Sequence, residues 1–305
     1  MGISWTTILF ILFLAFVPAL GWLLLYRYLD NRDPEPGFSS VFGVFLGISS
    51  TLPVFAMQYL FNAYPQLDLI SYLRGNLTTP LLFTSVFLLF VAFVEELMKG
   101  LAFIILFKKY ERFFNQVVDG IFYAALIGIG FALAENAYYL AKAWLTFKYN
   151  GNFVAILSIR SFGTMLAHTL FTAVFGFYFA KAYFAPFITK GDKSETWWNN
   201  LGNSFASAIR LRATFFYLLP KYDEKEPTLR RDAMIIEGFL VAILLHFLYN
   251  AMIKMELFGN NWTALIIPFI FIITWYVWSR FFIKPYIRII DFIKTKTDFY
   301  RVRIR

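Results

Sequence analysis

Apolar runs of membrane-spanning length dominate this sequence. A helix of roughly 20 residues crosses the ~30 Å hydrocarbon layer of a bilayer, and lipid leaves no partner for unpaired backbone groups, so apolar runs of this length are expected to be helical. The sequence therefore predicts an all-α polytopic membrane helix bundle, a single integral membrane domain over 1–305 with about seven transmembrane helices and an uncleaved first anchor. The runs cover about residues 5–26, 38–60, 80–107, 117–143, 153–183, 233–255 and 261–283.

The composition excludes a water-soluble domain and several kinds of chemistry. Hydrophobic residues make up 59% of the chain and charged residues 15%, with a mean hydropathy of +0.61. A soluble protein carries about a quarter charged residues. Because the chain has no cysteine, disulfides, thiol nucleophiles and Cys-ligated metals are excluded.

The basic residues predict the orientation in the membrane. With seven spans, 22 of the 28 Lys and Arg residues fall on one side and four on the other, while Lys99 and Arg160 lie within spans. Cytoplasmic segments hold the excess of Lys and Arg, so the N-terminus is predicted outside and the C-terminus inside. The net charge of +9 is therefore mainly a topology signal, and no nucleic-acid partner is expected.

Two segments lie outside the spans on the predicted cytoplasmic side. The insertion 184–232 repeats apolar residues at helical spacing beside arginines, a pattern that favours an amphipathic helix at the membrane interface. The tail 284–305 interleaves basic with apolar residues. Such a tail suits anionic lipids, and it also fits a plain topology signal.

Ionisable residues inside the spans are the strongest indication of function. Each costs ~2.5–3.5 kcal/mol on insertion scales, so residues of this kind are functional candidates by default. The protein has only two histidines, and both lie deep in apolar runs. The polar residues in the spans are Glu95, Glu96 and Lys99 in the third, Glu135 and Asn136 in the fourth, His168 and Thr172 in the fifth, and His246 and Asn250 in the sixth.

These residues are predicted to lie at a similar depth. Counting from the cytoplasmic helix ends at ~1.5 Å per residue places Glu95, His168 and His246 about 18–20 Å deep, with Glu135 somewhat deeper. One lysine cannot neutralise three carboxylates, so at least one acid must be protonated, bound to another cation, or in contact with water. Arg160 is expected to be paired or to extend toward the interface, because it lies near a span end.

The chemistry of this residue set leaves three functions open. Two imidazoles with carboxylates can hold Zn²⁺ while a further carboxylate takes a proton from water and an Asn amide stabilises an oxyanion. A metal-free version with a Glu base and His and Asn donors also works. The same chains of Glu and His serve proton- or metal-ion-coupled transporters, and a non-catalytic binding partner of membrane proteins is the third possibility.

Four short motifs carry a resemblance to a known family. EExxK begins at Glu95, FxxxEN at Phe131, HxxxT at His168 and HxxxN at His246. In this order on four successive spans they resemble the PrsW-type intramembrane proteases, which are distantly related to the CAAX-processing and bacteriocin-immunity membrane proteases. The resemblance covers about residues 80–255, and an Asp-Pro-Glu-Pro stretch at 33–36 is similar to a further family feature.

The resemblance implies an intramembrane endopeptidase in a prokaryotic plasma membrane, with 80–255 as its catalytic core. Its substrate would be a membrane-anchored protein or peptide, such as an anti-sigma factor. We expect Glu95 to be the general base and Glu96 to pair with Lys99, although the two glutamates could exchange roles. The expected catalytic group is Glu95, Glu96, Lys99 and the oxyanion donor Asn250, and the expected zinc ligands are Glu135, His168 and His246.

Overall fold

The protein is an all-helical bundle, as the sequence predicts. The computed structural model describes residues 4–29, 35–77, 79–148, 150–184 and 227–254. All regular elements within these ranges are helices, and six of them are long and apolar enough to cross a membrane. The predicted seventh span 261–283, the tail 284–305 and nearly all of the insertion 184–232, including its predicted interfacial helix, lie outside the described residues.

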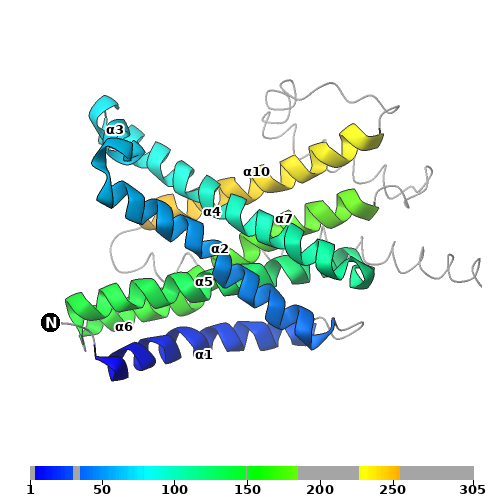
Figure 1. The fold of residues 1–305 in the computed structure, drawn as a ribbon, viewed down its shortest axis with the longest axis horizontal. Helices are drawn as coiled ribbons and strands as arrows, with labels where there is room; N and C mark the ends of the chain where they lie inside the picture. The colour runs from blue at the N-terminus through cyan, green and yellow to red at the C-terminus, as the bar shows by residue number, and fades with distance from the viewer. Residues whose placement is uncertain (1–3, 30–34, 78, 149, 185–226, 255–305) are drawn as a thin grey trace, which may run out of the picture.

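The described helices follow the predicted apolar runs closely (Figure 1). The fifth span differs in that three elements, α6, η3 and α7, form one continuous crossing in which η3 is a short π-helical stretch. In chain order the elements are α1 (Trp5–Leu29), α2 (Gly37–Ala63), η1 (Pro65–Leu67), α3 (Leu69–Asn76), α4 (Pro80–Tyr110), η2 (Glu111–Phe113), α5 (Val117–Phe147), α6 (Gly151–Ser158), η3 (Ile159–Thr164), α7 (Met165–Phe184) and α10 (Pro227–Lys254).

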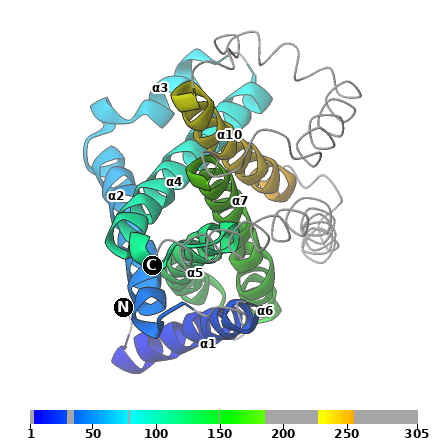
Figure 2. The same cartoon turned by 90° about the vertical axis from the view of Figure 1, so that its right-hand side faces the viewer.

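Helix α5 is the centre of the bundle. It packs against α7, α2 and α1, while α10 packs against α7 and α4 (Figure 2). Glycines let the backbones of these helices approach closely, because a small residue leaves no side chain in the interface. A Cβ atom at Gly128 would lie 2.7 Å from the carbonyl oxygen of His168, and one at Gly176 would lie 2.1 Å from that of Gly120. The α5–α7 contact is therefore one of backbone against backbone.

A glycine on the other face of α5 allows a test of this packing. A Cβ atom at Gly130 would lie 2.1 Å from the Val44 carbonyl oxygen of α2. We expect Gly130→Ala to force the two helices apart and to lower the free energy of unfolding by about 1–3 kcal/mol, measured by thermal unfolding in detergent. Gly21→Ala is the matched control, since nothing lies within 4 Å of its Cβ position. Equal stability of the two variants would contradict the close packing.

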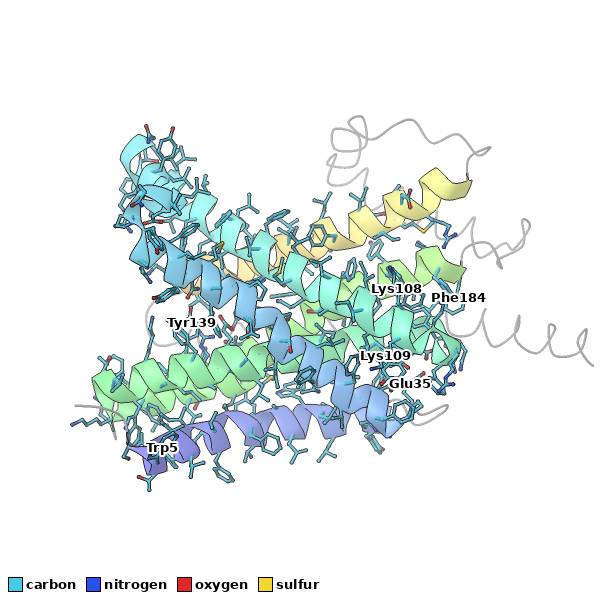
Figure 3. The ribbon with its side chains drawn as sticks, viewed as in Figure 1. Trp5, Glu35, Lys108, Lys109, Tyr139 and Phe184 are labelled. Atoms are coloured by element: carbon cyan, nitrogen blue, oxygen red, sulfur yellow. The ribbon has the colours of Figure 1, made fainter. Side chains whose placement is uncertain are left out.

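The described spans place their connections at two opposite ends of the bundle. Figure 3 shows Glu35, Lys108, Lys109 and Phe184 at one end and Trp5 at the other. The connections α1–α2 and α4–α5 and the residues that flank the 184–232 insertion all lie at the end that carries Lys108 and Lys109 (Figure 1). The described spans therefore alternate in direction, and the assignment of this end to the cytoplasm stays a prediction.

A buried polar link fixes the first connection at this end. Arg27 of α1 donates from NH1 to the Glu35 carbonyl oxygen at 2.8 Å and to Ser40 Oγ at 2.9 Å. The Tyr123 hydroxyl of α5 donates to Glu35 Oε2. Because Glu35 and Tyr123 are both buried, the link holds the α1–α2 connection against the start of the central helix.

Candidate active site

Four helices bring ionisable side chains together in the middle of the bundle. Helix α4 contributes Glu95, Glu96 and Lys99, α5 contributes Glu135, α7 contributes His168 and α10 contributes His246. The Lys99 side chain is 0% exposed and the Glu96 side chain 2%. Glu95, His168 and His246, which are expected at a similar depth, therefore lie close together in the structure.

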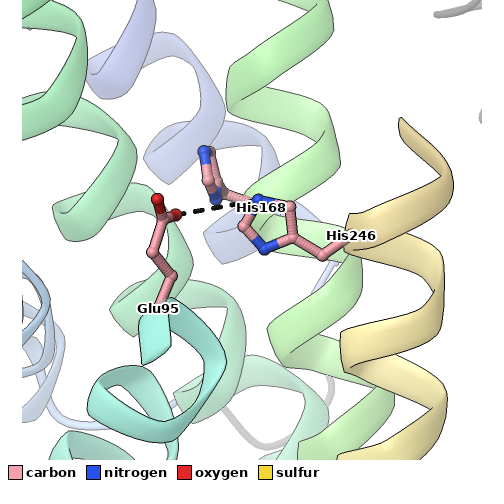
Figure 4. Close-up of side chains that lie close together, drawn as sticks. All are labelled: Glu95, His168 and His246. Atoms are coloured by element: carbon pink, nitrogen blue, oxygen red, sulfur yellow. Dashed lines mark ion pairs between the residues drawn. The ribbon is translucent and has the colours of Figure 1, made fainter. Parts of the chain in front are cut away.

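Glu96 joins Lys99 to His246. Lys99 Nζ lies 2.6 Å from Glu96 Oε1, and His246 Nδ1 lies 2.8 Å from the same oxygen. An ionised carboxylate only accepts hydrogen bonds, so Nδ1 carries the proton and donates. The other ring nitrogen, Nε2, faces Glu95 Oε2 at 3.7 Å (Figure 4), which is too long for a hydrogen bond.

His168 is held on both sides. Its Nδ1 lies 2.9 Å from Lys99 Nζ and its Nε2 lies 2.9 Å from Glu135 Oε2. A lysine ammonium has donors but no acceptor, so Nδ1 accepts from Lys99 and Nε2 donates to Glu135. Arg160 NH1 lies 3.1 Å from the same Glu135 oxygen, which therefore serves two donors.

The two imidazoles share one pattern. Their centroids lie 5.1 Å apart with the ring planes at 88°, and each ring gives one N–H to a carboxylate, Glu96 or Glu135. The remaining nitrogens are thereby fixed toward Lys99 and Glu95. A carboxylate that takes one ring N–H and orients the other nitrogen is the usual support of a metal-binding histidine.

The residues present fit a divalent cation. Glu95, His168 and His246 each offer a ligand atom, all three atoms lie within 4.8 Å of one another, and all three residues are buried. Glu95 Oε2 is buried and has no hydrogen-bond partner among the described residues. In a tetrahedral zinc site the ligand atoms lie on the order of 3.3–3.5 Å apart, so a modest contraction would complete it. Binding through His168 Nδ1 would also require Lys99 to shift from that nitrogen.

The sequence matches the family described as PrsW family intramembrane metalloprotease over residues 35–219. The chain belongs to the PrsW family. The matched range includes α2, α4, α5 and α7, with the first three motifs, and ends before α10. Six membrane-length helices and bacterial PrsW relatives make it a multi-pass prokaryotic membrane protein.

Several curated PrsW relatives are similar to the chain. Protease PrsW of Geobacillus kaustophilus is 34% identical over 166 residues, which is 53% of this chain and 63% of the relative. Protease PrsW of Bacillus subtilis is 30% identical over 209 residues, 65% of this chain and 83% of the relative. Protease PrsW of Halalkalibacterium halodurans is 25% identical over 263 residues, 86% and 90% of the two chains. The chain thus spans less than two thirds of the Geobacillus relative, and no solved structure matches it.

The structure places the predicted site residues in different surroundings, and their roles stay predictions. Glu95 lies in the three-residue ligand group with both histidines, whereas Glu135, expected as a metal ligand, contacts His168 and Arg160. Asn250, the expected oxyanion donor, is half-buried on α10 one turn beyond His246. Thr172 bonds to its own helix, donating to the His168 carbonyl oxygen at 2.8 Å.

Sequence reasoning gave Arg160 no role in the site, and the structure places its guanidinium against Glu135. The available signal was an arginine inside an apolar run, which requires a carboxylate partner. Its place near a span end predicts either a pair or an extension toward the interface, and the structure shows the pair. The partner could not be counted from the helix ends, because a π turn changes the register.

Proposed function

We propose that the protein is a membrane-embedded endopeptidase that hydrolyses a peptide bond of a membrane-anchored protein. The observation that carries the proposal is the buried group of Glu95, His168 and His246. The two imidazoles of this group donate their ring N–H groups to the carboxylates of Glu135 and Glu96. Membership of the PrsW family supports the same reaction. A buried, oriented set of acids and imidazoles can activate water where bulk solvent is excluded.

In the metal-free mechanism the roles follow from the contacts of each side chain. Glu95 accepts the proton of the attacking water, since its Oε2 has no other partner among the described residues. His246 Nε2 faces that oxygen and can carry the proton on to the leaving amine. Glu96 holds the imidazole in this orientation through Nδ1, and Lys99 balances the Glu96 charge. Asn250, one turn beyond His246, is proposed to donate to the oxyanion.

The proposed cofactor is Zn²⁺, held by Glu95, His168 and His246. With the ion bound, Glu95 and His246 would be ligands and would not carry protons. When bound there, it would polarise the scissile carbonyl and activate water as a Lewis acid. The ring N–H contacts to Glu96 and Glu135 orient both imidazoles toward that position with or without the ion. Glu135 is then proposed to support His168 from outside the ligand group.

The test uses the full chain in liposomes with a library of single-span peptides. We expect the wild type to cleave at least one peptide and His246→Ala to cleave it roughly 10²-fold more slowly, since a proton-transfer group of this kind contributes 10²–10⁴-fold. Leu244→Ala is the control on the same helix, because this side chain is 53% exposed and lies outside the site. Undiminished cleavage by His246→Ala would refute the site.

Metal analysis of the same samples tests the cofactor. We expect about one equivalent of Zn²⁺ in the wild type, as a single mononuclear site requires, and its loss from His246→Ala. Cleavage should stop on chelation and return with added Zn²⁺. Metal below about a tenth of an equivalent in active protein, with cleavage that survives chelation, would exclude zinc and leave the metal-free glutamate mechanism.

A further inference from the structure

Arg160 touches the site but belongs to none of the four motifs. Its NH1 lies 3.1 Å from Glu135 Oε2, and its guanidinium carbon lies 3.8 Å from the centroid of the Tyr139 ring. The Arg160 side chain is 19% exposed and that of Glu135 12%, whereas those of His168 and Lys99 are 4% and 0% exposed. The Arg160–Glu135 pair therefore forms the more open edge of the site.

The π turn η3 holds Arg160 in this place, and three other helices hold the turn. Asn136 of α5 donates from Nδ2 to the Arg160 carbonyl oxygen at 2.9 Å, and Trp22 of α1 donates from Nε1 to the Ser161 carbonyl oxygen at 3.2 Å. The hydroxyls of Thr164 and Tyr249, the latter on α10, lie 3.1 Å apart. A π turn inserts a residue and redirects its side chains, and such turns are frequent at functional sites.

Arg160 acts on His168 through Glu135. The same carboxylate oxygen accepts from the guanidinium at 3.1 Å and from His168 Nε2 at 2.9 Å. Arginine can hold a carboxylate in a fixed direction with its planar set of donors. A carboxylate fixed there favours the His168 tautomer with the proton on Nε2, which leaves the Nδ1 lone pair directed into the site toward Lys99.

We propose that Arg160 is a positioning residue that holds Glu135 against His168 Nε2, so that Glu135 on Nε2 and Lys99 on Nδ1 together fix the tautomer of that imidazole. The consequence for cleavage rests on the proposed function, because the inward Nδ1 lone pair matters only if the site performs chemistry. The tautomer itself is a property of the resting protein. A merely structural ion pair would stabilise the bundle without affecting the hydrogen bond from His168 Nε2 to Glu135.

The two-histidine composition makes the test direct. Protein labelled with ¹⁵N-histidine contains two rings, and the spectrum of His246→Ala assigns their signals. In wild-type protein freed of metal by a chelator, we expect His168 with Nε2 protonated and Nδ1 unprotonated. In Arg160→Met we expect the His168 Nε2–H signal to shift as its hydrogen bond to Glu135 weakens, with the signals of His246 nearly unchanged. Arg160→Lys should restore most of the wild-type pattern, because it can still donate to Glu135.

Kinetics on a cleaved peptide give the second readout. Loss of an outer-shell partner that orients a metal-binding histidine typically costs 10–100-fold in metal affinity or activity. We therefore expect kcat of Arg160→Met to fall by about that factor with KM nearly unchanged. Lys142→Met is the matched control. This variant removes another cation that lies over a tyrosine of α5, 4.6 Å from the centroid of the Tyr138 ring. It should change neither the ¹⁵N signals of His168 nor kcat.

Each outcome decides the proposal. A wild-type His168 protonated on Nδ1, or unchanged His168 signals in Arg160→Met, would leave Arg160 with a structural role only. If Arg160→Met does not fold, Arg160→Gln replaces it, since this shorter neutral side chain lacks the guanidinium donors. Unchanged His168 signals in Arg160→Gln would likewise leave Arg160 with a structural role only. A wild type that cleaves no peptide would overturn the proposed function, while the spectra, which need no substrate, would still decide the role of Arg160.

Discussion

Glu95→Gln is expected to lower the rate of peptide cleavage by about 10⁴-fold, the upper range for loss of a general base, while the protein remains folded. The amide has nearly the shape of the carboxylate but cannot take a proton from water. Stability should be retained, because Glu95 Oε2 has no hydrogen-bond partner among the described residues that the substitution would break. The measurement is the initial rate in liposomes on a peptide that the wild type cleaves.

The same substitution at the end of the same span provides the control. Glu111 lies on η2, is exposed and accepts a hydrogen bond from the Tyr183 hydroxyl. Glu111→Gln should leave the rate within about twofold of the wild type, as expected for an exposed side chain outside the site. If Glu95→Gln retained more than a tenth of the wild-type rate, Glu95 could be neither the base nor a required ligand.

Lys99→Met should produce the largest loss of stability. Lys99 and Glu96 form a fully buried pair at 2.6 Å, and removing one partner leaves the other as an uncompensated buried charge. The expected cost is about 3–5 kcal/mol in the free energy of unfolding. It can be measured by denaturant or thermal unfolding in detergent, where the destabilised variant should unfold well before the wild type.

A double variant separates the loss of charge balance from the loss of packing. Lys99→Met with Glu96→Gln removes both charges, so most of the stability should return even though activity does not. Lys108→Met on the same helix is the control, because Lys108 is exposed at the end of the bundle and such surface changes lie within about 0.5 kcal/mol. A double variant as unstable as Lys99→Met would show that the buried charge is not the cause.

The sequence was most informative where geometry is fixed by the bilayer. A constant rise per residue and a constant membrane thickness determine depth, so counting from helix ends was enough to place Glu95, His168 and His246 at one level. The ends of the six described spans followed from the same length argument. The depth of a residue and the ends of a span depend on the rise of the helix and the thickness of the bilayer, and hardly on tertiary contacts.

What could not be predicted depends on contacts between helices. The hydrogen-bond partners of Glu95 and Glu135 depend on which donors reach each carboxylate, and Arg160 reaches Glu135 from a π turn held by Asn136 and Trp22. The pairing of Glu35 with Tyr123, 88 residues away, is also a matter of packing. No periodicity in the sequence records any of these contacts.

The glycine contacts between α5 and α7 have a consequence for how a substrate can enter. Gly128 and Gly176 bring these two backbones into direct contact with no side chain between them. We therefore expect the two helices to stay packed against each other. Helix α4 meets the site through side chains, and a Cβ atom at its Gly100 would be no nearer than 3.8 Å to a neighbour. We expect α5 and α7 to stay packed as a rigid pair and α4 to move away from them. A polypeptide would then enter beside Glu95.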